Sequence, residues 1–179
     1  MTPLEIVAYD PQWPAQFARE RARLAAALGA VAVRIDHNGS TSVPGLASKP
    51  VIDIQVSVAA VQPMDPYLPV LERLGYVHLP HADDAFCPYF HRPSAWPHSH
   101  HVHVVEAGGV EEARTLAFRD YLRAHPAVAD AYARLKRGLA PEFSAAEPEA
   151  RQAYADAKGA FIERIIATAL AEGYPRGRG

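Results

Sequence analysis

The spacing of hydrophobic and polar residues changes along the chain, and each spacing predicts a different element. In "AVAVRID", residues 30–36, and "VIDIQVSV", residues 51–58, apolar side chains recur at every second position, which is typical of strands. Shorter runs follow between prolines, namely "YVHL", "AFCPYFH" and "HHVHVVE", and they predict further strands. The middle of the chain is therefore expected to form a sheet.

Helical spacing is found on both sides of this region. Phe17, Leu24 and Leu28 lie on one face of a predicted helix that ends before a glycine. After Gly108-Gly109 the sequence becomes rich in Ala, Leu, Arg and Glu, which predicts a series of helices. The expected helices cover residues 14–28, 66–74, 110–124, 127–143 and 148–172.

This order of elements predicts an α+β fold: a mixed β-sheet flanked by helices, which we expect on one side of it, and a C-terminal helical segment. A length of 179 residues favours one domain with its own core. We expect a single domain over residues 1–179, with a sheet core at about 30–107 and a helical tail at about 110–172.

Composition excludes several classes of partner. A formal net charge of −2 provides no basic surface for an extended nucleic acid. The N-terminus lacks the pattern of a signal peptide, and no apolar run reaches the roughly 18 residues of a membrane span. We therefore expect a cytoplasmic protein. Cys87 is the only cysteine, and we interpret it as a small buried residue and not as a nucleophile.

The first candidate functional residues lie in "HNGSTSVPGLASKPVIDIQV", residues 37–56. Gly39 allows the backbone to approach a ligand, and Ser40, Thr41 and Ser42 supply hydroxyl and amide donors. Such a loop either holds a phosphate or simply connects two strands. Asp53 follows among apolar neighbours, where a carboxylate is costly unless it is paired, hydrogen-bonded or bound to a metal.

The same residues carry a family resemblance. Gly-Ser, followed about a dozen residues later by the Asp of "VIDI", resembles the signature of the polymerase-β-type nucleotidyltransferase superfamily. The fuller string "HNGSTSVPGLASKPVIDI" is similar to the GrpB family within it, as are "YDPQWPAQFARERARL", "HHVHVVEAGG", "LAFRDYLRAHP" and "YADAKGAFI". The resemblance covers nearly the whole chain and implies a nucleotidyltransferase-like fold. It also implies that Gly39 and Ser40 hold nucleotide phosphate and that Asp53 is a catalytic metal ligand.

One position departs from the superfamily pattern. The second carboxylate, expected two residues after Asp53, is Gln55 here, and a neutral amide adds no charge to a two-cation site. On a strand, His101 and His103 share one face, so they are candidate metal ligands with Asp53 and Gln55, and His103 is a candidate catalytic residue. Imidazoles favour softer ions such as Mn²⁺, Zn²⁺ or Ni²⁺ over Mg²⁺. A histidine run on the surface is the simpler alternative.

Four further residues are candidate nucleotide contacts, because they lie in strings that resemble the family. Lys49 precedes the strand that carries Asp53, Arg119 lies in "FRDYLR", and Lys158 follows Tyr154 by one helical turn, so that these two share a face. Each charged residue is by itself more typical of a solvated surface. Together they predict a small nucleotide or coenzyme-like ligand.

Three functions are compatible with these residues. The first is a metal-dependent nucleotidyltransferase acting on an unknown acceptor. The second is a non-catalytic accessory module that binds a nucleotide or coenzyme. GrpB-like segments also occur joined to dephospho-coenzyme A kinase, which indicates a link to coenzyme A biosynthesis. The third is a phosphohydrolase, because "SHHVHVV" resembles the motif of histidine-triad hydrolases, although Ser99 replaces its first histidine.

Overall fold

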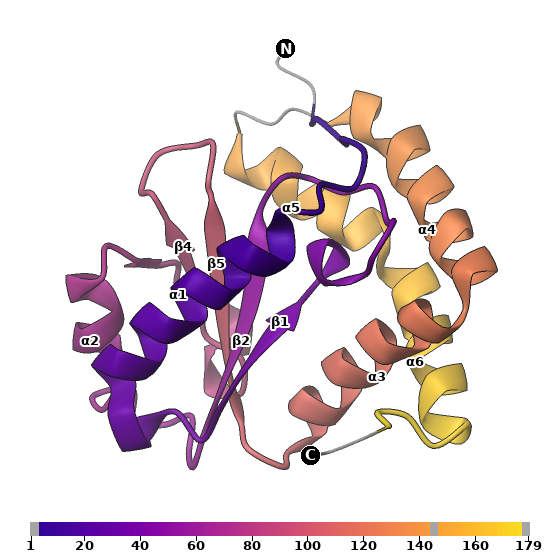
Figure 1. Ribbon diagram of the computed structural model, residues 1–179. Helices are drawn as coiled ribbons and strands as arrows, with labels where there is room; N and C mark the ends of the chain where they lie inside the picture. The colour runs from indigo at the N-terminus through magenta and orange to yellow at the C-terminus, as the bar shows by residue number, and fades with distance from the viewer. Residues whose placement is uncertain (1–3, 144–146, 177–179) are drawn as a thin grey trace.

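The computed structural model describes residues 4–143 and 147–176 and is built around a five-stranded mixed sheet (Figure 1). The strands are hydrogen-bonded in the order β1-β2-β5-β4-β3. β2 and β5 run parallel, and the other neighbouring pairs run antiparallel. The strands are β1 (Arg34–Asn38), β2 (Ile52–Val58), β3 (Val77–His78), β4 (Tyr89–Arg92) and β5 (His100–Glu106).

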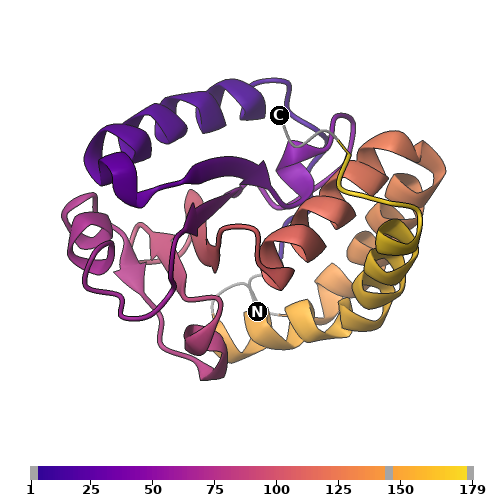
Figure 2. The same ribbon diagram turned by 90° about the horizontal axis from the view of Figure 1, so that it is seen from below.

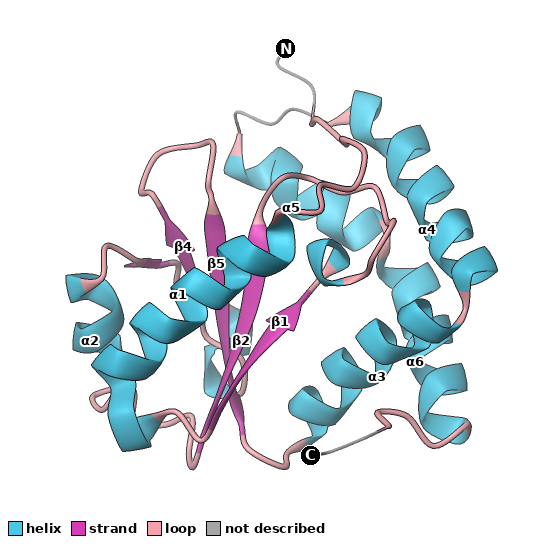
Figure 3. Ribbon diagram, in the orientation of Figure 1, coloured by secondary structure: helices cyan, strands magenta, loops and turns pink. Residues whose placement is uncertain are grey.

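Helices cover both faces of the sheet (Figures 2 and 3). The expected mixed sheet with flanking helices and a C-terminal helical segment is confirmed. The expectation that helices cover one side is wrong, because the N-terminal helix lies on the face opposite α3. The helices are α1 (Trp13–Leu28), α2 (Leu68–Arg73), α3 (Val110–Ala124), α4 (Pro126–Leu139), α5 (Pro148–Ala157) and α6 (Gly159–Ala171).

The alternation along β2 explains why the two faces differ. Ile54 and Val56 are fully buried in the main core, where they pack with Leu24 of α1. The intervening Gln55 and Ser57 point the other way and hydrogen-bond to α3. Because successive side chains of a strand face opposite sides, one face of β2 builds the core and the other carries its polar residues, Asp53 included.

Some element boundaries differ from the expected ones. The first strand begins at Arg34 and not at residue 30, because residues 29–31 form a 3-10 turn that ends α1. The helix expected over residues 127–143 ends at Leu139 and continues as a 3-10 turn that contains Pro141, since proline disfavours an uninterrupted helix. The helix expected over residues 148–172 is divided into α5 and α6 just before Gly159, a residue with weak helix propensity.

Two predictions from the sequence concern membrane-spanning helices and the single cysteine, Cys87. No helix within the described residues is long and apolar enough to cross a membrane. Cys87 is half-buried, and burial raises the pKa of its thiol to about 12. The thiol therefore stays protonated at neutral pH and is a poor nucleophile.

Candidate functional site

The loop between β1 and β2 lies directly against Asp53. Gly39 has a φ of +64°, and a Cβ added to it would lie 2.4 Å from Oδ2 of Asp53 and 2.8 Å from its Cβ. Any larger residue would therefore have to displace the Asp53 side chain, in a backbone conformation that already disfavours it. Glycine at this position brings the loop and the carboxylate together.

The hydroxyls of the loop have different roles. Ser42 Oγ donates to the Gly39 carbonyl at 2.6 Å, and Thr41 Oγ1 lies 3.0 Å from Nε2 of His37. Both residues are buried, so these two hydroxyls hold the 3-10 turn in shape. Ser40 Oγ instead accepts a hydrogen bond at 2.9 Å from Nζ of Lys136, a residue of α4. Of the three predicted hydroxyl contacts, Ser40 alone connects the loop to a cationic group.

Asp53 belongs to a hydrogen-bonded chain of side chains. Its neighbour in the sheet register is His101, whose Nδ1 lies 3.2 Å from Asp53 Oδ1. His101 Nε2 in turn lies 3.1 Å from Nδ1 of His98, and the His98 ring stacks on His91 at 4.0 Å between centroids. All three histidines are buried. We call Asp53, His101 and His98 the Asp53 chain.

The protonation of the Asp53 chain follows from its contacts. Burial by itself would raise the pKa of Asp53, but the hydrogen bond from His101 and the charges nearby bring it well below its ordinary range. Burial lowers the pKa of His101 and brings that of His98 to about 3, so both rings are neutral. A carboxylate only accepts hydrogen bonds, so His101 donates from Nδ1 and accepts the His98 Nδ1–H at Nε2.

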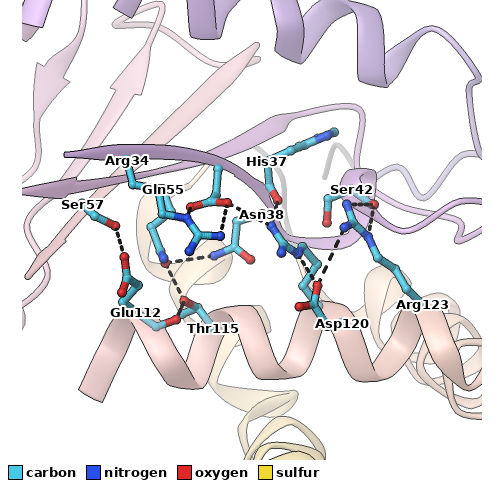
Figure 4. Close-up of polar contacts among 12 residues, drawn as sticks. Arg34, His37, Asn38, Ser42, Gln55, Ser57, Glu112, Thr115, Asp120 and Arg123 are labelled. Atoms are coloured by element: carbon cyan, nitrogen blue, oxygen red, sulfur yellow. Dashed lines mark hydrogen bonds and ion pairs between the residues drawn. The ribbon is translucent and has the colours of Figure 1, made fainter. Parts of the chain in front are cut away.

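Gln55 lies between the sheet and α3, where its oxygen is already engaged (Figure 4). Gln55 is fully buried, and its Oε1 accepts hydrogen bonds from Asn38 at 3.3 Å and from Thr115 at 2.5 Å. Arg119 donates to the His37 carbonyl at 3.1 Å and to Oδ1 of Asp120, the next residue of α3, at 2.7 Å. The predicted nucleotide contact of Arg119 stays a prediction, and its observed partners connect α3 to β1.

His103 lies across the strands from Gln55 and is half-buried. Its Nδ1 is 4.0 Å from Sγ of Cys87, and its ring lies 5.1 Å from that of Tyr89. Burial lowers the pKa of His103 to about 4. The sequence prediction that His101 and His103 share the face of Asp53 and Gln55 is confirmed by the strand register, whereas their chemical roles stay predictions.

Three lysines surround this end of the sheet. Lys136 is 3% exposed, donates to Ser40 Oγ and lies over the Tyr132 ring at 4.7 Å. Lys158 lies over the Tyr154 ring at 4.2 Å. Burial and the charge of Lys158 lower the pKa of Lys136 to about 7, and burial and the charge of Lys49 do the same for Lys158. We call Lys49, Lys136 and Lys158 the lysine cluster.

The polar atoms left without partners near this cluster are hydrogen-bond donors. The Tyr154 hydroxyl and the Gln55 Nε2 are buried and have no hydrogen-bond partner among the described residues. The side chains of Lys49 and Lys158 make no hydrogen bond or ion pair in the described part of the chain either. Because buried donors are costly when unpaired, this arrangement suits a ligand that is rich in acceptor oxygens.

Two groups of residues at this site were not predicted from the sequence. Lys136 and Tyr132 of α4 were not singled out, although Lys136 lies one turn after Tyr132 on the face that also buries Ala129 and Ala133. A lysine on an otherwise apolar helix face is a signal for a buried cation. The contact of His98 with His101 was not predicted either, because it depends on a loop that the periodicity of β5 does not describe.

The side chains near Asp53 do not fit a metal site as they lie. Among the described residues, no group of three or more His, Cys, Asp or Glu side chains is arranged to hold an ion. His101 uses both ring nitrogens within the Asp53 chain, and the Gln55 oxygen accepts two hydrogen bonds. The predicted metal roles of Asp53, Gln55, His101 and His103 stay predictions, and they would need these contacts to rearrange.

Two pockets lie at the other end of β2. One has a volume of about 230 Å³ and is lined by residues that include Val58 and Tyr67. The second, of about 610 Å³, is lined by residues that include Phe86, Glu106 and Glu111. Neither lining contains a lysine or arginine, and the second contains two carboxylates, so their chemistry does not suit a phosphate.

Acid is expected to destabilise the fold through its buried histidines. Burial lowers the pKa of His37 to about 4, that of His98 to about 3 and that of His103 to about 4. Below the ordinary histidine pKa of about 6.5, the unfolded chain takes up protons that the folded chain does not, so stability falls as the pH drops toward about 4.

We expect the melting temperature to fall by at least about 3 °C between pH 7 and pH 5, which corresponds to about 1 kcal/mol for a chain of this size. Differential scanning calorimetry at a series of pH values measures this change. A melting temperature that stays level or rises over the same interval would contradict neutral, buried histidines.

Comparisons with known proteins cover almost the whole chain. The model of a family described as "GrpB protein" matches residues 3–168. A UPF0157 protein of Halalkalibacterium halodurans is 40% identical over 169 residues, which cover 94% of this chain and 83% of that protein. The crystal structure of conserved protein GrpB from Enterococcus faecalis has a TM-score of 0.81 and 35% identity, and the match covers 94% of this chain and 98% of that one.

A further relative is larger than this chain. A protein named dephospho-CoA kinase, from Mycolicibacterium paratuberculosis, is 35% identical over 159 residues. The match covers 75% of this chain and 39% of that protein. The similarity therefore concerns one part of the kinase-named protein.

Proposed function

Because the chain belongs to the GrpB protein family, we propose that the region around Asp53 and the lysine cluster binds the phosphates of a nucleotide or of a coenzyme-like molecule. The observation that carries this proposal is the composition of the site. The charge of Lys49 lowers the pKa of both Lys136 and Lys158, and all three lysines interact with a single carboxylate, that of Asp53. Such an excess of positive charge favours a polyanion.

The geometry adds directional contacts to this charge. Lys136 donates to Ser40, so a cation and the Gly39-Ser40 loop lie side by side. The unpaired Tyr154 hydroxyl supplies a further donor. A bound phosphate would give these donors acceptors, and it would favour the protonated forms of Lys136 and Lys158, whose pKa values burial brings to about 7.

The organic group attached to the phosphates is defined less narrowly than the phosphates themselves. The rings of Tyr132 and Tyr154 lie beside the lysines and offer apolar surface against which a base can pack. The relative named dephospho-CoA kinase supports including coenzyme precursors among the candidates. We therefore propose a nucleoside triphosphate or a coenzyme A precursor as the ligand class.

Binding is the part of the predicted function that these observations support. Nucleotidyl transfer through Asp53 and His103 stays a prediction, because the second carboxylate is replaced by Gln55, whose oxygen is engaged. The histidine-triad alternative has less support, since His101, which lies within the alternating motif, uses both nitrogens for its contacts with Asp53 and His98. The non-catalytic binding module is the form of the hypothesis that we carry forward.

Calorimetric titration of the full chain tests this proposal. The probes are AMP, ADP, ATP, CTP, GTP and dephospho-coenzyme A, and we expect affinity to rise from AMP to ATP as phosphates are added. Lys158→Met removes one charge from the lysine cluster and is expected to weaken ATP binding by about tenfold or more. Arg164→Met is the matched control, because it removes an equal charge from an exposed position of α6.

Two outcomes would contradict the proposal. One is the absence of binding for every probe. The other is an equal loss of affinity in Lys158→Met and Arg164→Met, because general attraction to a charged surface would produce that result without a defined site.

A further inference from the structure

We propose that this phosphate site neutralises its ligand with the lysine cluster and requires no divalent cation, the Asp53 chain serving to position a carboxylate and not to hold a metal. The inference rests on the proposed function and deepens it. It departs from the two-cation arrangement that the sequence resemblance implies, because each potential ligand already makes other contacts.

His101 has no lone pair to offer. Its Nδ1–H donates to Asp53 Oδ1 at 3.2 Å, and its Nε2 lone pair accepts the His98 Nδ1–H at 3.1 Å. A neutral imidazole has one donor and one acceptor, so both are used. A metal at His101 would have to break the contact with His98 and leave a buried donor unpaired, which is costly.

Gln55 offers no free oxygen either. Its Oε1 accepts hydrogen bonds from Asn38 and from Thr115, which occupy both of its lone pairs. The group that remains unpaired is its Nε2 amide, and an amide N–H donates to acceptors but does not ligate cations. The residue that replaces the expected second carboxylate therefore presents a donor where a metal would need an acceptor.

Asp53 has one carboxylate oxygen in a hydrogen bond and the other packed against the loop. Oδ1 accepts from His101, and Oδ2 lies so close to Gly39 that a Cβ there would be 2.4 Å away. Without His101 and Gln55, the remaining candidate is the second ring nitrogen of His103. One constrained carboxylate and one imidazole are fewer ligands than a stable metal site normally has.

The surrounding charge also disfavours a cation. Lys49, Lys136 and Lys158 all act electrostatically on Asp53 or on one another, and a divalent ion among them would be repelled. A bound polyphosphate favours the protonated forms of these lysines, which then provide for it what metal ions provide in other sites. Asp53, held in place by His101, then partly offsets the repulsion among the lysines while the site is empty of ligand.

The test compares ATP binding in EDTA with ATP binding in excess MgCl₂, by calorimetry on the full wild-type chain. Mg²⁺ cancels part of the negative charge of ATP, so a lysine site binds the metal-free nucleotide at least as tightly. We expect the Kd in EDTA to be no higher than the Kd in MgCl₂. A Kd that rises by about tenfold or more in EDTA, a change of about 1.4 kcal/mol, would overturn the inference.

The outcomes separate this inference from the proposed function. Binding that needs a metal overturns the inference and leaves phosphate binding in place. Absence of ATP binding in both solutions overturns both. Binding that persists in EDTA and is weakened by Lys158→Met but not by Arg164→Met supports both.

A second measurement does not depend on the nucleotide. Mn²⁺ alone is titrated into the wild-type chain and into Asp53→Asn, and we expect no Mn²⁺ binding that the substitution removes. In ¹⁵N NMR spectra, we expect His101 to carry its proton on Nδ1, and His98→Phe to alter the His101 signals. Stoichiometric Mn²⁺ binding that is lost in Asp53→Asn would overturn the inference.

Discussion

Replacing Lys136 with methionine is expected to weaken the binding of ATP by about 10- to 100-fold, the effect of losing a hydrogen bond from a charged group. Lys136 is buried, donates to Ser40 Oγ and lies over the Tyr132 ring, so it joins the α4 helix to the loop predicted to hold phosphate. Methionine has a similar length and suits an apolar neighbourhood. Calorimetric titration with ATP measures the loss, and thermal unfolding of the variant verifies that the fold persists.

The matched control is Arg134→Met on the same helix. Arg134 is exposed, so its substitution changes the net charge equally without touching the site, and we expect ATP affinity to stay within about twofold of the wild type. Equal affinities for Lys136→Met and the wild type, with both chains folded, would contradict a role for Lys136 in phosphate binding.

The second large effect is expected at the contact between the loop and Asp53. Gly39→Ala places a Cβ at 2.4 Å from Asp53 Oδ2 and at 2.8 Å from its Cβ, on a residue whose φ is +64°. The positive φ combined with a ψ of −172°, a conformation found essentially only in glycine, costs an alanine about 1–3 kcal/mol, and the overlap must also push Asp53 away from His101. We expect a lower melting temperature and a loss of ATP binding.

Gly45→Ala separates these two contributions. Gly45 belongs to the same loop and has a φ of +80°, but no atom lies within 4 Å of a Cβ built there. We expect it to cost about 1–2 kcal/mol of stability from the backbone alone and to leave ATP affinity unchanged. If the two variants lose equal stability and both still bind ATP, the contact of Gly39 with Asp53 has no role in the site.

The residues responsible for these expected effects come from two distant parts of the chain. The Gly39-Ser40 loop belongs to the N-terminal half, whereas Lys136 and Lys158 come from the C-terminal helices. The site is completed only when α4 packs against the loop between β1 and β2 and α6 packs against α3. Fragments that retain the Gly-Ser and Asp motif but lack these helices would therefore lack most of the positive charge.

The strands that carry the candidate residues could be predicted from the sequence. The alternation in "VIDIQVSV" and "HHVHVVE" predicted β2 and β5, and the period of two also placed His101 and His103 on one face. The strands and their faces can be predicted from periodicity because the side chains of a strand alternate between a core face and a polar face. Asp53 was recognisable because a carboxylate among β-branched residues is costly without a partner.

Tertiary structure decided the identity of those partners. Parallel pairing of β2 with β5 set His101 beside Asp53, and the loop before β5 brought His98 to His101. Neither contact follows from local spacing, because the residues involved are brought together by strand pairing and by a loop without periodicity. The same holds for Gln55, whose oxygen accepts a second hydrogen bond because α3 packs over it and presents Thr115.

The sequence by itself thus determined the elements, their polar and apolar faces and the residues with unusual chemistry, because these depend on neighbours within a few positions. It did not determine the division of the last helix near Lys158 or the burial of Lys136 beside Ser40. Both depend on tertiary packing: Lys136, for example, meets Ser40, which lies 96 positions earlier in the chain, and there long-range contacts and desolvation outweigh local propensity. Packing therefore decided that this end of the sheet is rich in lysine donors.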